Sequence, residues 1–218
     1  MNDAAAAAPD GRYAEFPEGF FSRIDDGDDA TFYDQPRLVT HIDDGAIAAV
    51  SAFYGSLGVD GDVLDLCSSW ISHLPVRPRR LVVLGMNAEE LARNDAAHEA
   101  VVHDLNAQPR LPFADGDFDT AVCTVSVDYL TRPLEVFDEV ARVVRPGGVF
   151  ACTFSNRCFP TKAIRGWLAG DDRFHVQLVA EYFRRSNGWL APEAAHCNAG
   201  LPGDPLFAVW ARRAAPEG

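Results

Sequence analysis

The sequence predicts an α/β protein built on a mostly parallel sheet. From residue 62 onwards, short runs of β-branched and aliphatic residues alternate with stretches of helical periodicity, the pattern of strand–helix–strand units. The second expected strand, RRLVVLG (79–85), is a continuous apolar run, as expected where helices cover both faces of a parallel sheet. With 218 residues, 48% of them hydrophobic, the chain is long enough for one domain with a sizeable core.

The expected elements follow one another along the chain. A helix precedes the sheet, because apolar residues between positions 42 and 53 recur at helical spacing and glycines follow them. Pro133 lies at the start of a later helix with an apolar face, and RPGG (145–148) ends it. The expected strands are 62–66, 79–85, 100–105, 118–127, 148–155 and 206–213. The other expected helices are 89–96, 161–168 and 173–185.

Charge is distributed unevenly along the chain. The net charge is −13, and residues 1–62 alone hold thirteen acidic and three basic residues, a net charge of −10. We interpret RIDDGDDATFYD (23–34) as a solvated, partly disordered leader, with an acidic binding patch as the alternative. No basic stripe is present, so nucleic acid is not an expected partner. No membrane span or signal peptide is recognisable, so we expect a cytoplasmic protein without membrane contact.

The cysteines indicate free thiols. An odd number in a chain without an export signal argues against disulfides, and no zinc-like spacing with histidine predicts a metal site. Two of them lie inside apolar runs and are expected in the core. Cys67 and Cys158 follow the ends of two strands, so they can approach each other, as a soft-metal or redox pair would. The five are Cys67, Cys123, Cys152, Cys158 and Cys197.

The most specific segment is LPFADGDFDTAVCTVSVDYLTRPLEVFDEVARVVRPGGVFACTFSN (111–156). It contains Leu-Pro-Phe, an acidic turn, Phe-Asp, a strand, a helix with Glu-Val-x-Arg, then Arg-Pro-Gly-Gly and a strand. In this order and spacing it resembles class I S-adenosylmethionine-dependent methyltransferases of the type-11-like branch. The resemblance implies a three-layer sandwich with a doubly wound, Rossmann-like, seven-stranded sheet whose last strand is antiparallel. It also implies residues 1–40 as an acidic arm or lid and residues 41–218 as a single domain.

The resemblance implies S-adenosylmethionine as cofactor, although the turn after the first strand departs from the family. In VLDLCSSWISHLP (63–75), Asp65 matches the family acid, but Cys67, Ser69 and Ile71 stand at the glycine positions. A side chain at positive φ costs about 1 kcal/mol or more, so we expect another backbone path or a shifted cofactor. The hydroxyls of Ser68 and Ser69 would replace lost backbone contacts, with Trp70 as an apolar wall. The alternative is a decayed loop whose residues only cap a following helix.

Other expected cofactor contacts follow later strands and precede the first. In LGMN, Gly85 is followed by Asn87 where the family has a ribose-binding carboxylate, and the alternative for Asn87 is a helix N-cap. The resemblance assigns Asp104 and Leu105 to the adenine ring. It places Val125, within 124–126, along the cofactor. From the arm, Tyr33 and Arg37 are expected to cover the pocket.

Candidates for chemistry are His73, Asp128, Tyr129 and Cys158. Methyl transfer from a sulfonium gains much from proximity and alignment, and an alcohol or phenol acceptor needs a base whereas a thiolate does not. We therefore predict a methyltransferase acting on a small molecule. The alternatives are a lapsed or repurposed binding protein and a thiol- or metalloid-linked methyl transfer that uses Cys67 and Cys158. A homodimer through residues 189–198 and the last strand is left open.

Overall fold

Seven strands form one sheet in the order β3-β2-β1-β4-β5-β7-β6. The structure, a computed structural model, describes residues 11–215, so the alanine-rich start of the chain, residues 1–10, lies outside it. Strands β1 to β5 pair in parallel, and β7 runs antiparallel to its neighbours β5 and β6. The predicted seven-stranded, doubly wound sheet with an antiparallel last strand is therefore confirmed. The strands are β1 Asp62–Leu66, β2 Arg80–Gly85, β3 Glu99–Val102, β4 Phe118–Thr124, β5 Val144–Phe154, β6 Glu193–His196 and β7 Phe207–Arg212.

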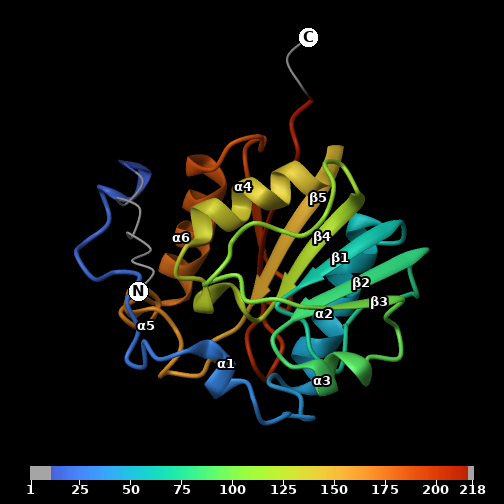
Figure 1. The fold of residues 1–218 in the computed structure, drawn as a ribbon, viewed down its shortest axis with the longest axis horizontal. Helices are drawn as coiled ribbons and strands as arrows, with labels where there is room; N and C mark the ends of the chain where they lie inside the picture. The colour runs from blue at the N-terminus through green and yellow to red at the C-terminus, as the bar shows by residue number, and fades with distance from the viewer. Residues whose placement is uncertain (1–10, 216–218) are drawn as a thin grey trace, which may run out of the picture.

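Helices cover both faces of the sheet (Figure 1). On one face, α4 (Pro133–Val143), α5 (Arg165–Leu168) and α6 (Asp172–Arg185) enclose the larger apolar core. On the other, α2 (Asp44–Leu57) and α3 (Ala88–Ala92) enclose a second core. None of the described helices is long and apolar enough to cross a membrane. The three-layer arrangement follows from the continuous apolar strands, which must be covered on both sides.

The connection between β1 and β2 is unusual because it contains no helix. A crossover between parallel strands is normally carried by a helix, but residues 67–79 run as an irregular loop. Helix α2, which precedes β1 in the chain, shares a core with Val63 of β1 and Val122 of β4. The idea that Cys67 and its neighbours cap a following helix is therefore wrong. No helix N-terminus from this loop is available for an anionic ligand.

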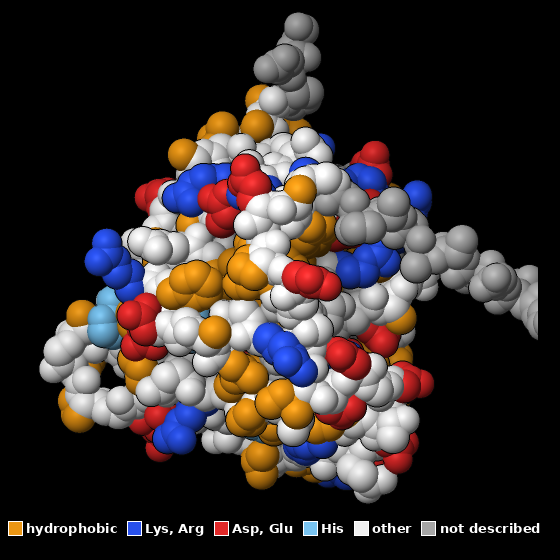
Figure 2. Space-filling view, turned by 90° about the vertical axis from the view of Figure 1, so that its left-hand side faces the viewer, with side chains coloured by type: hydrophobic (Ala, Val, Ile, Leu, Met, Phe, Trp, Pro, Cys, Tyr) orange, Lys and Arg blue, Asp and Glu red, His pale blue; other side chains and the backbone are white. Residues whose placement is uncertain are grey.

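The N-terminal arm, residues 11–42, is folded onto the domain. It contains two short helices, η1 (Gly11–Tyr13) and α1 (Asp29–Phe32). Aromatic side chains of the arm, Tyr13, Phe16, Phe20 and Phe21, pack against the larger core. Figure 2 shows the arm's side of the molecule, where hydrophobic side chains gather between charged ones. The arm is thus bound to the domain by apolar contacts as well as by polar ones.

Buried ion pairs also bind the acidic part of the arm to the domain. Asp29 is buried and pairs with Arg23 at 2.7 Å and with Lys162 at 3.0 Å. Lys162, which follows β5, is fully buried and also pairs with Asp25 at 3.1 Å. The prediction that residues 23–34 form a solvated, partly disordered leader is therefore wrong. Although burial opposes the shift, hydrogen bonds from Arg23, Asn106 and Lys162 hold the pKa of Asp29 below its usual value.

Several element boundaries differ from those expected. Strand β6 was not expected, and it lies within residues 189–198, where it forms a sheet edge through antiparallel pairing with β7. Strand β3 is shorter than the expected 100–105, and α3 ends before the expected residue 96. The RPGG turn ends α4 as expected, but the structure includes it in β5, with an irregularity in the pairing to β4. Gly148 is needed there because a Cβ would lie 2.4 Å from the Asp119 carbonyl oxygen.

Candidate functional site

A cavity lies at the carboxyl ends of the central strands. Strand order reverses between β1 and β4, and ligands of open α/β sheets bind at such points. The cavity has a volume of about 280 Å³, and the arm forms one of its walls. Every residue predicted for the site lines it except Trp70 and Asp128. Lining residues that sequence reasoning did not assign include Asp29, Glu90, Asn106 and Phe159.

Asp65, near the end of β1, is held by serine hydroxyls. Its Oδ2 accepts hydrogen bonds from Ser68 Oγ at 2.8 Å and Ser72 Oγ at 2.6 Å. Burial raises the pKa of Asp65 to about 6, although the two hydroxyls oppose this shift. Asn94 donates to Ser72 Oγ at 2.9 Å and to the Ser69 carbonyl oxygen at 3.1 Å, which fixes the loop from α3's side. Serine side chains thus order this loop: Ser68, expected to contact the cofactor, donates its hydroxyl proton to Asp65, and the roles of Ser72 and Asn94 were not foreseen.

Cys67 keeps the backbone conformation that favours glycine. Its φ of 52° lies in the left-handed region, so the expectation that the loop avoids this conformation is wrong at this residue. Its thiol interacts with Cys123 on β4, and this contact and burial raise the pKa of the Cys67 thiol well above its usual range. Cys67 and Cys158 both line the cavity, so a pairing of the two thiols stays a prediction. Among the described residues, no three His, Cys, Asp or Glu side chains are grouped to hold a metal ion.

Trp70 does not fill the cavity or form its wall. Its side chain is outside the lining, and its Nε1 donates to the Val39 carbonyl oxygen at 3.2 Å. Gly85, at the end of β2, permits close packing of the same loop, because a Cβ there would lie 2.2 Å from the Ser68 carbonyl oxygen. The Ser68 amide donates to the Leu84 carbonyl oxygen at 2.8 Å, which fixes this approach. Both residues therefore position chain segments around the cavity.

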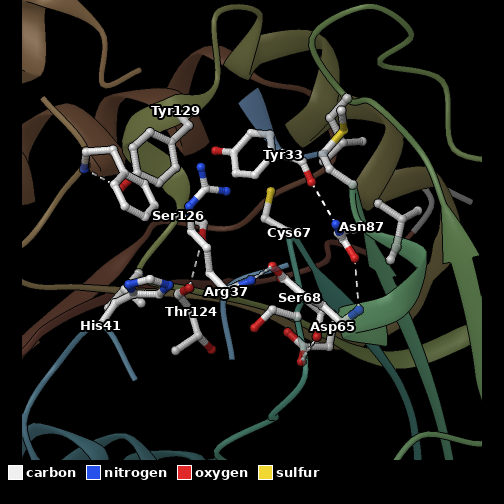
Figure 3. Close-up of a pocket in the computed structure, with 18 of the residues that line it drawn as sticks. Tyr33, Arg37, His41, Asp65, Cys67, Ser68, Asn87, Thr124, Ser126 and Tyr129 are labelled. Carbon is white, nitrogen blue, oxygen red and sulfur yellow. Dashed lines mark hydrogen bonds between the residues drawn. The ribbon is translucent and has the colours of Figure 1, made fainter. Parts of the chain in front are cut away.

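Asn87 joins the arm to the start of α3. Its Oδ1 accepts from the backbone N–H groups of Glu89 and Glu90, both at 3.0 Å, so the N-cap interpretation is confirmed. Its Nδ2 donates to the carbonyl oxygens of Tyr33 at 2.8 Å and Asp34 at 3.1 Å. Figure 3 shows this carboxamide turned toward the arm. Both N–H bonds of the amide are thus used within the chain.

Asp104 and Asn106 organise the loop after β3. Asp104 Oδ1 accepts from the backbone N–H groups of Asn106 at 2.8 Å and Ala107 at 3.1 Å. Among the described residues, its other oxygen has no hydrogen-bond donor, and the side chain lines the cavity. Asn106 donates to Asp29 Oδ2 at 2.9 Å and to the Tyr129 carbonyl oxygen at 3.0 Å. The loop after β3 therefore joins the arm to the segment after β4.

The β4 and β5 side of the cavity is aromatic. Tyr129, in η2 (Val127–Tyr129), accepts a hydrogen bond on its hydroxyl from the Phe159 amide at 2.8 Å. Phe159, which follows β5, has its ring 5.1 Å from His41 and 5.5 Å from Phe32 of the arm. Burial lowers the pKa of His41 and of His73, so both imidazoles are neutral at neutral pH. A neutral imidazole carries an acceptor nitrogen that is able to take a proton.

Asp128 lies beside the cavity and not on its wall. Its carboxyl is buried, and its Oδ2 has no hydrogen-bond partner among the described residues. Burial raises the pKa of Asp128 to about 8, so the carboxyl is protonated at neutral pH. Cys158 does line the cavity, and burial raises the pKa of its thiol to about 11. The expectation that Asp128 points toward a substrate is wrong.

The residues present suit some parts of S-adenosylmethionine and not others. The second oxygen of Asp104 suits the amino group of an adenine ring, and Leu105 lines the cavity beside it. The hydroxyls and amides of residues 67–69 lie where the resemblance places the amino-acid end of the cofactor. Asn87 does not suit the ribose diol, because its donors bind arm carbonyls and its oxygen caps α3. The adenine side fits, and contacts to a ribose must come from groups other than Asn87.

Comparison with known proteins agrees with this geometry. Residues 68–152, about two fifths of the chain, match the family model described as a methyltransferase domain. The biotin biosynthesis bifunctional protein BioHC of Teredinibacter turnerae is 30% identical over 78 residues, which are 36% of this chain and 14% of that protein. The chain therefore spans about one seventh of the length of this relative. The resemblance to class I methyltransferases inferred from residues 111–156 is confirmed by this match.

Solved structures share the fold at low sequence identity. A chain of the Haloferax volcanii complex between the Trm112 methyltransferase activator and a methyltransferase has a TM-score of 0.58 and 15% identity, covering 80% of this chain and 92% of that one. Geranyl diphosphate C-methyltransferase from Streptomyces coelicolor has a TM-score of 0.51 and 14% identity, covering 76% and 77%. The [4+2]-cyclase SpnF has a TM-score of 0.55 and 14% identity, covering 85% and 92%. One fold thus accommodates different reactions.

Proposed function

We propose that this protein is an S-adenosylmethionine-dependent methyltransferase that acts on a small molecule. One observation carries the proposal: within the matched methyltransferase domain, the cavity lies at the topological switch point, and Asp104 faces it with an unused carboxylate oxygen. Adenine recognition by this oxygen and Leu105 would hold the cofactor across the ends of β1 and β2. The sequence contains no stripe of basic residues, which agrees with a small-molecule acceptor rather than a nucleic acid.

The bound cofactor would supply a methyl group on a positively charged sulfur, with a neutral thioether as leaving group. The chain's own contribution is mainly alignment and exclusion of water. The arm places Tyr33 and Arg37 over the cavity, and Asn87 holds the arm there. Where the acceptor is a hydroxyl or amine, neutral His41 or His73 would take its proton. His41 lies beside Phe159 and is the better placed of the two for an acceptor on the β4 and β5 side.

Calorimetric titration with S-adenosylmethionine and S-adenosylhomocysteine tests the proposal. We expect micromolar dissociation constants for the wild-type protein. Asp104→Asn keeps an oxygen for the turn amides but replaces the unused oxygen with an N–H donor, which faces the adenine amino group unfavourably. We expect this variant to weaken S-adenosylhomocysteine binding about tenfold or more, the effect of losing a charge-assisted hydrogen bond. Asp60→Asn, at an exposed position outside the cavity, is the matched control.

A second function, a methyltransferase fold reused for binding, is favoured by Asn87. Both N–H groups of its amide donate to arm carbonyl oxygens, so the side chain at the family's ribose position offers no free donor. If calorimetry detects no binding of millimolar S-adenosylhomocysteine to the wild-type protein, this second function is favoured and the first is rejected. Unchanged affinity in Asp104→Asn, with binding intact in the wild type, would reject only the adenine contact.

A further inference from the structure

A positively charged side chain points into the cavity without an acidic partner. The Arg37 guanidinium lies 4.5 Å from the Phe32 ring centroid, 5.5 Å from that of Phe159 and 5.9 Å from that of Tyr33. Its Nη2 donates to the Phe32 carbonyl oxygen at 2.8 Å, and its Nη1 makes a long contact of 3.4 Å with the Gln35 carbonyl oxygen. Among the described residues, it forms no ion pair with a carboxylate. Arginine is left charged, held in place by aromatic rings.

Two acidic side chains that line the cavity with Arg37, Asp29 and Glu90, form no ion pair with its guanidinium. Asp29 is paired with Arg23 and Lys162 and accepts a hydrogen bond from Asn106. Glu90 accepts the backbone N–H of Arg37 itself at 2.6 Å, which fixes the start of this side chain. The chain thus positions Arg37 while leaving its charge unneutralised. In a protein with a net charge of −13, such a cation in a cavity needs an explanation.

The Arg37 guanidinium lies apart from Asn87, the residue at the family's ribose position. Figure 3 shows its guanidinium near Ser126, Tyr33 and Tyr129, away from Asn87. The other arginine of the cavity wall, Arg157, is largely exposed and pairs with Asp204 at 2.8 Å. His41 is neutral, because burial lowers its pKa. One rigid guanidinium with free N–H donors matches one planar carboxylate.

We propose that Arg37 binds a carboxylate of the methyl acceptor. This inference rests on the proposed function and adds to it the class of substrate, a small organic acid. The rings of Phe32 and Phe159 flank the guanidinium, so an apolar or aromatic body next to the carboxylate would pack against them. Tyr129 and His41 then stand around the rest of the acceptor.

The test uses the full-length protein and pairs of ligands that differ only in charge. A panel of aliphatic and aromatic carboxylates, including benzoate and 4-hydroxybenzoate, is titrated beside the matching primary amides, with and without saturating S-adenosylhomocysteine. We expect at least one acid to bind about tenfold or more tightly than its amide, and Arg37→Gln to abolish this preference. Arg37→Lys should retain part of it. Arg110→Met, exposed and outside the cavity, is the control.

A second arm distinguishes the acceptor from the cofactor as the source of the carboxylate. S-adenosylhomocysteine carries an amino-acid carboxylate, and 5′-methylthioadenosine lacks it. We expect Arg37→Gln to leave the affinity ratio of these two ligands unchanged. A loss of S-adenosylhomocysteine affinity alone would assign Arg37 to the cofactor and overturn the proposal, as would a wild-type panel without any preference for acid over amide. If the wild type binds neither nucleoside, the proposed function is wrong. The preference for acids over amides is still measured in that case, because the panel is also titrated without S-adenosylhomocysteine.

Discussion

In the described part of the chain, ionisable side chains form ion pairs at the amino ends of β1 and β4 but not at the carboxyl end of β1. At the amino ends of β1 and β4, Asp62 and Asp119 form ion pairs with Arg79 and Arg145. The Arg79 guanidinium holds the pKa of Asp62 below its usual range. At the carboxyl end of β1, Asp65 is buried with hydroxyl partners only, and burial raises its pKa to about 6. The same strands therefore carry a neutralised edge and an edge with unpaired ionisable groups.

This difference separates structure from function. Paired, solvent-facing charges at the amino ends contribute solubility and a little stability. Unpaired or shifted groups at the carboxyl ends, namely Asp65, Asp128 and Arg37, cost stability and are retained where a ligand would meet them or their neighbours. The buried pairs of the arm are an intermediate case, because their charges are compensated but removed from water.

Replacement of Lys162 should show that buried ion pairs contribute more to the free energy of unfolding than the exposed pairs at the amino ends. Lys162→Met removes a cation that is fully buried in the wild type and that pairs with Asp25 and Asp29. We expect it to lower the free energy of unfolding by about 3 kcal/mol, as measured by urea denaturation, because buried Asp29 keeps only Arg23 as an ionic partner and the carbonyl oxygens of Asp25 and Gly27 lose their donor. Arg79→Met removes a cation from the exposed amino-end pairs and should cost about 1 kcal/mol or less. Similar losses in the two variants would contradict the contrast between the edges.

The pH dependence of stability should differ in sign between Asp128 and Asp119. Asp128 has a folded pKa of about 8, above its unfolded value, so the folded state keeps a proton that the unfolded chain releases. Wild-type stability should therefore fall, relative to Asp128→Asn, by about 1.4 kcal/mol per pH unit between about pH 5 and pH 7. The pKa of Asp119 is lowered, so its contribution is present at neutral pH and is lost only in acid.

Free energies of unfolding between pH 3 and pH 8, in steps of about one unit, check this prediction for the wild type, Asp128→Asn and Asp119→Asn. Only the slope is compared, because the asparagine amide at position 128 adds a constant cost. A flat difference between the wild type and Asp128→Asn would show that this carboxyl is not protonated in the folded protein.

Much of the fold could be predicted because it depends on patterns that are local in the sequence. The apolar runs place β1, β2, β4, β5 and β7 within a few residues of their observed bounds. Strand β6 escaped prediction because Glu193–His196 is short and rich in alanine, which has little strand preference. The missing helix after β1 had a signal in Pro75 and Pro78, since proline interrupts helices.

The location of the candidate site could be predicted from the sequence, but the hydrogen bonds within it could not. Because parallel strands end at one edge, residues such as Asp65 and Asp104 were expected to meet, and both line the cavity. The partner of Asn87 could not be predicted, because it depends on where the arm carbonyls lie after folding. The same holds for Asn106, which joins residues from the arm and from the segment after β4. Such contacts between distant residues have no local pattern.

At the carboxyl ends of the strands, Asn87→Asp tests whether position 87 anchors the arm or binds a ligand. A carboxylate cannot donate to the carbonyl oxygens of Tyr33 and Asp34, and it repels them. We expect faster amide hydrogen exchange over residues 33–40 and an S-adenosylhomocysteine dissociation constant raised about tenfold. Asn156→Asp, at an exposed position, should change neither. Tighter binding in Asn87→Asp would instead mean that position 87 contacts the ribose, as in the family.

The smallest expected effect concerns the backbone of Cys67. Cys67→Gly and Cys67→Ala both remove the thiol that interacts with Cys123, but only glycine relieves the left-handed φ of 52°. We expect the glycine variant to exceed the alanine variant by about 1 kcal/mol in free energy of unfolding. At Cys152, inside β5, the order should reverse, because glycine weakens a strand by about 0.5–1 kcal/mol relative to alanine. Equal stability of the two variants at position 67 would mean that the loop relaxes its backbone once the thiol is gone, so that the contact with Cys123 is what holds Cys67 in this conformation.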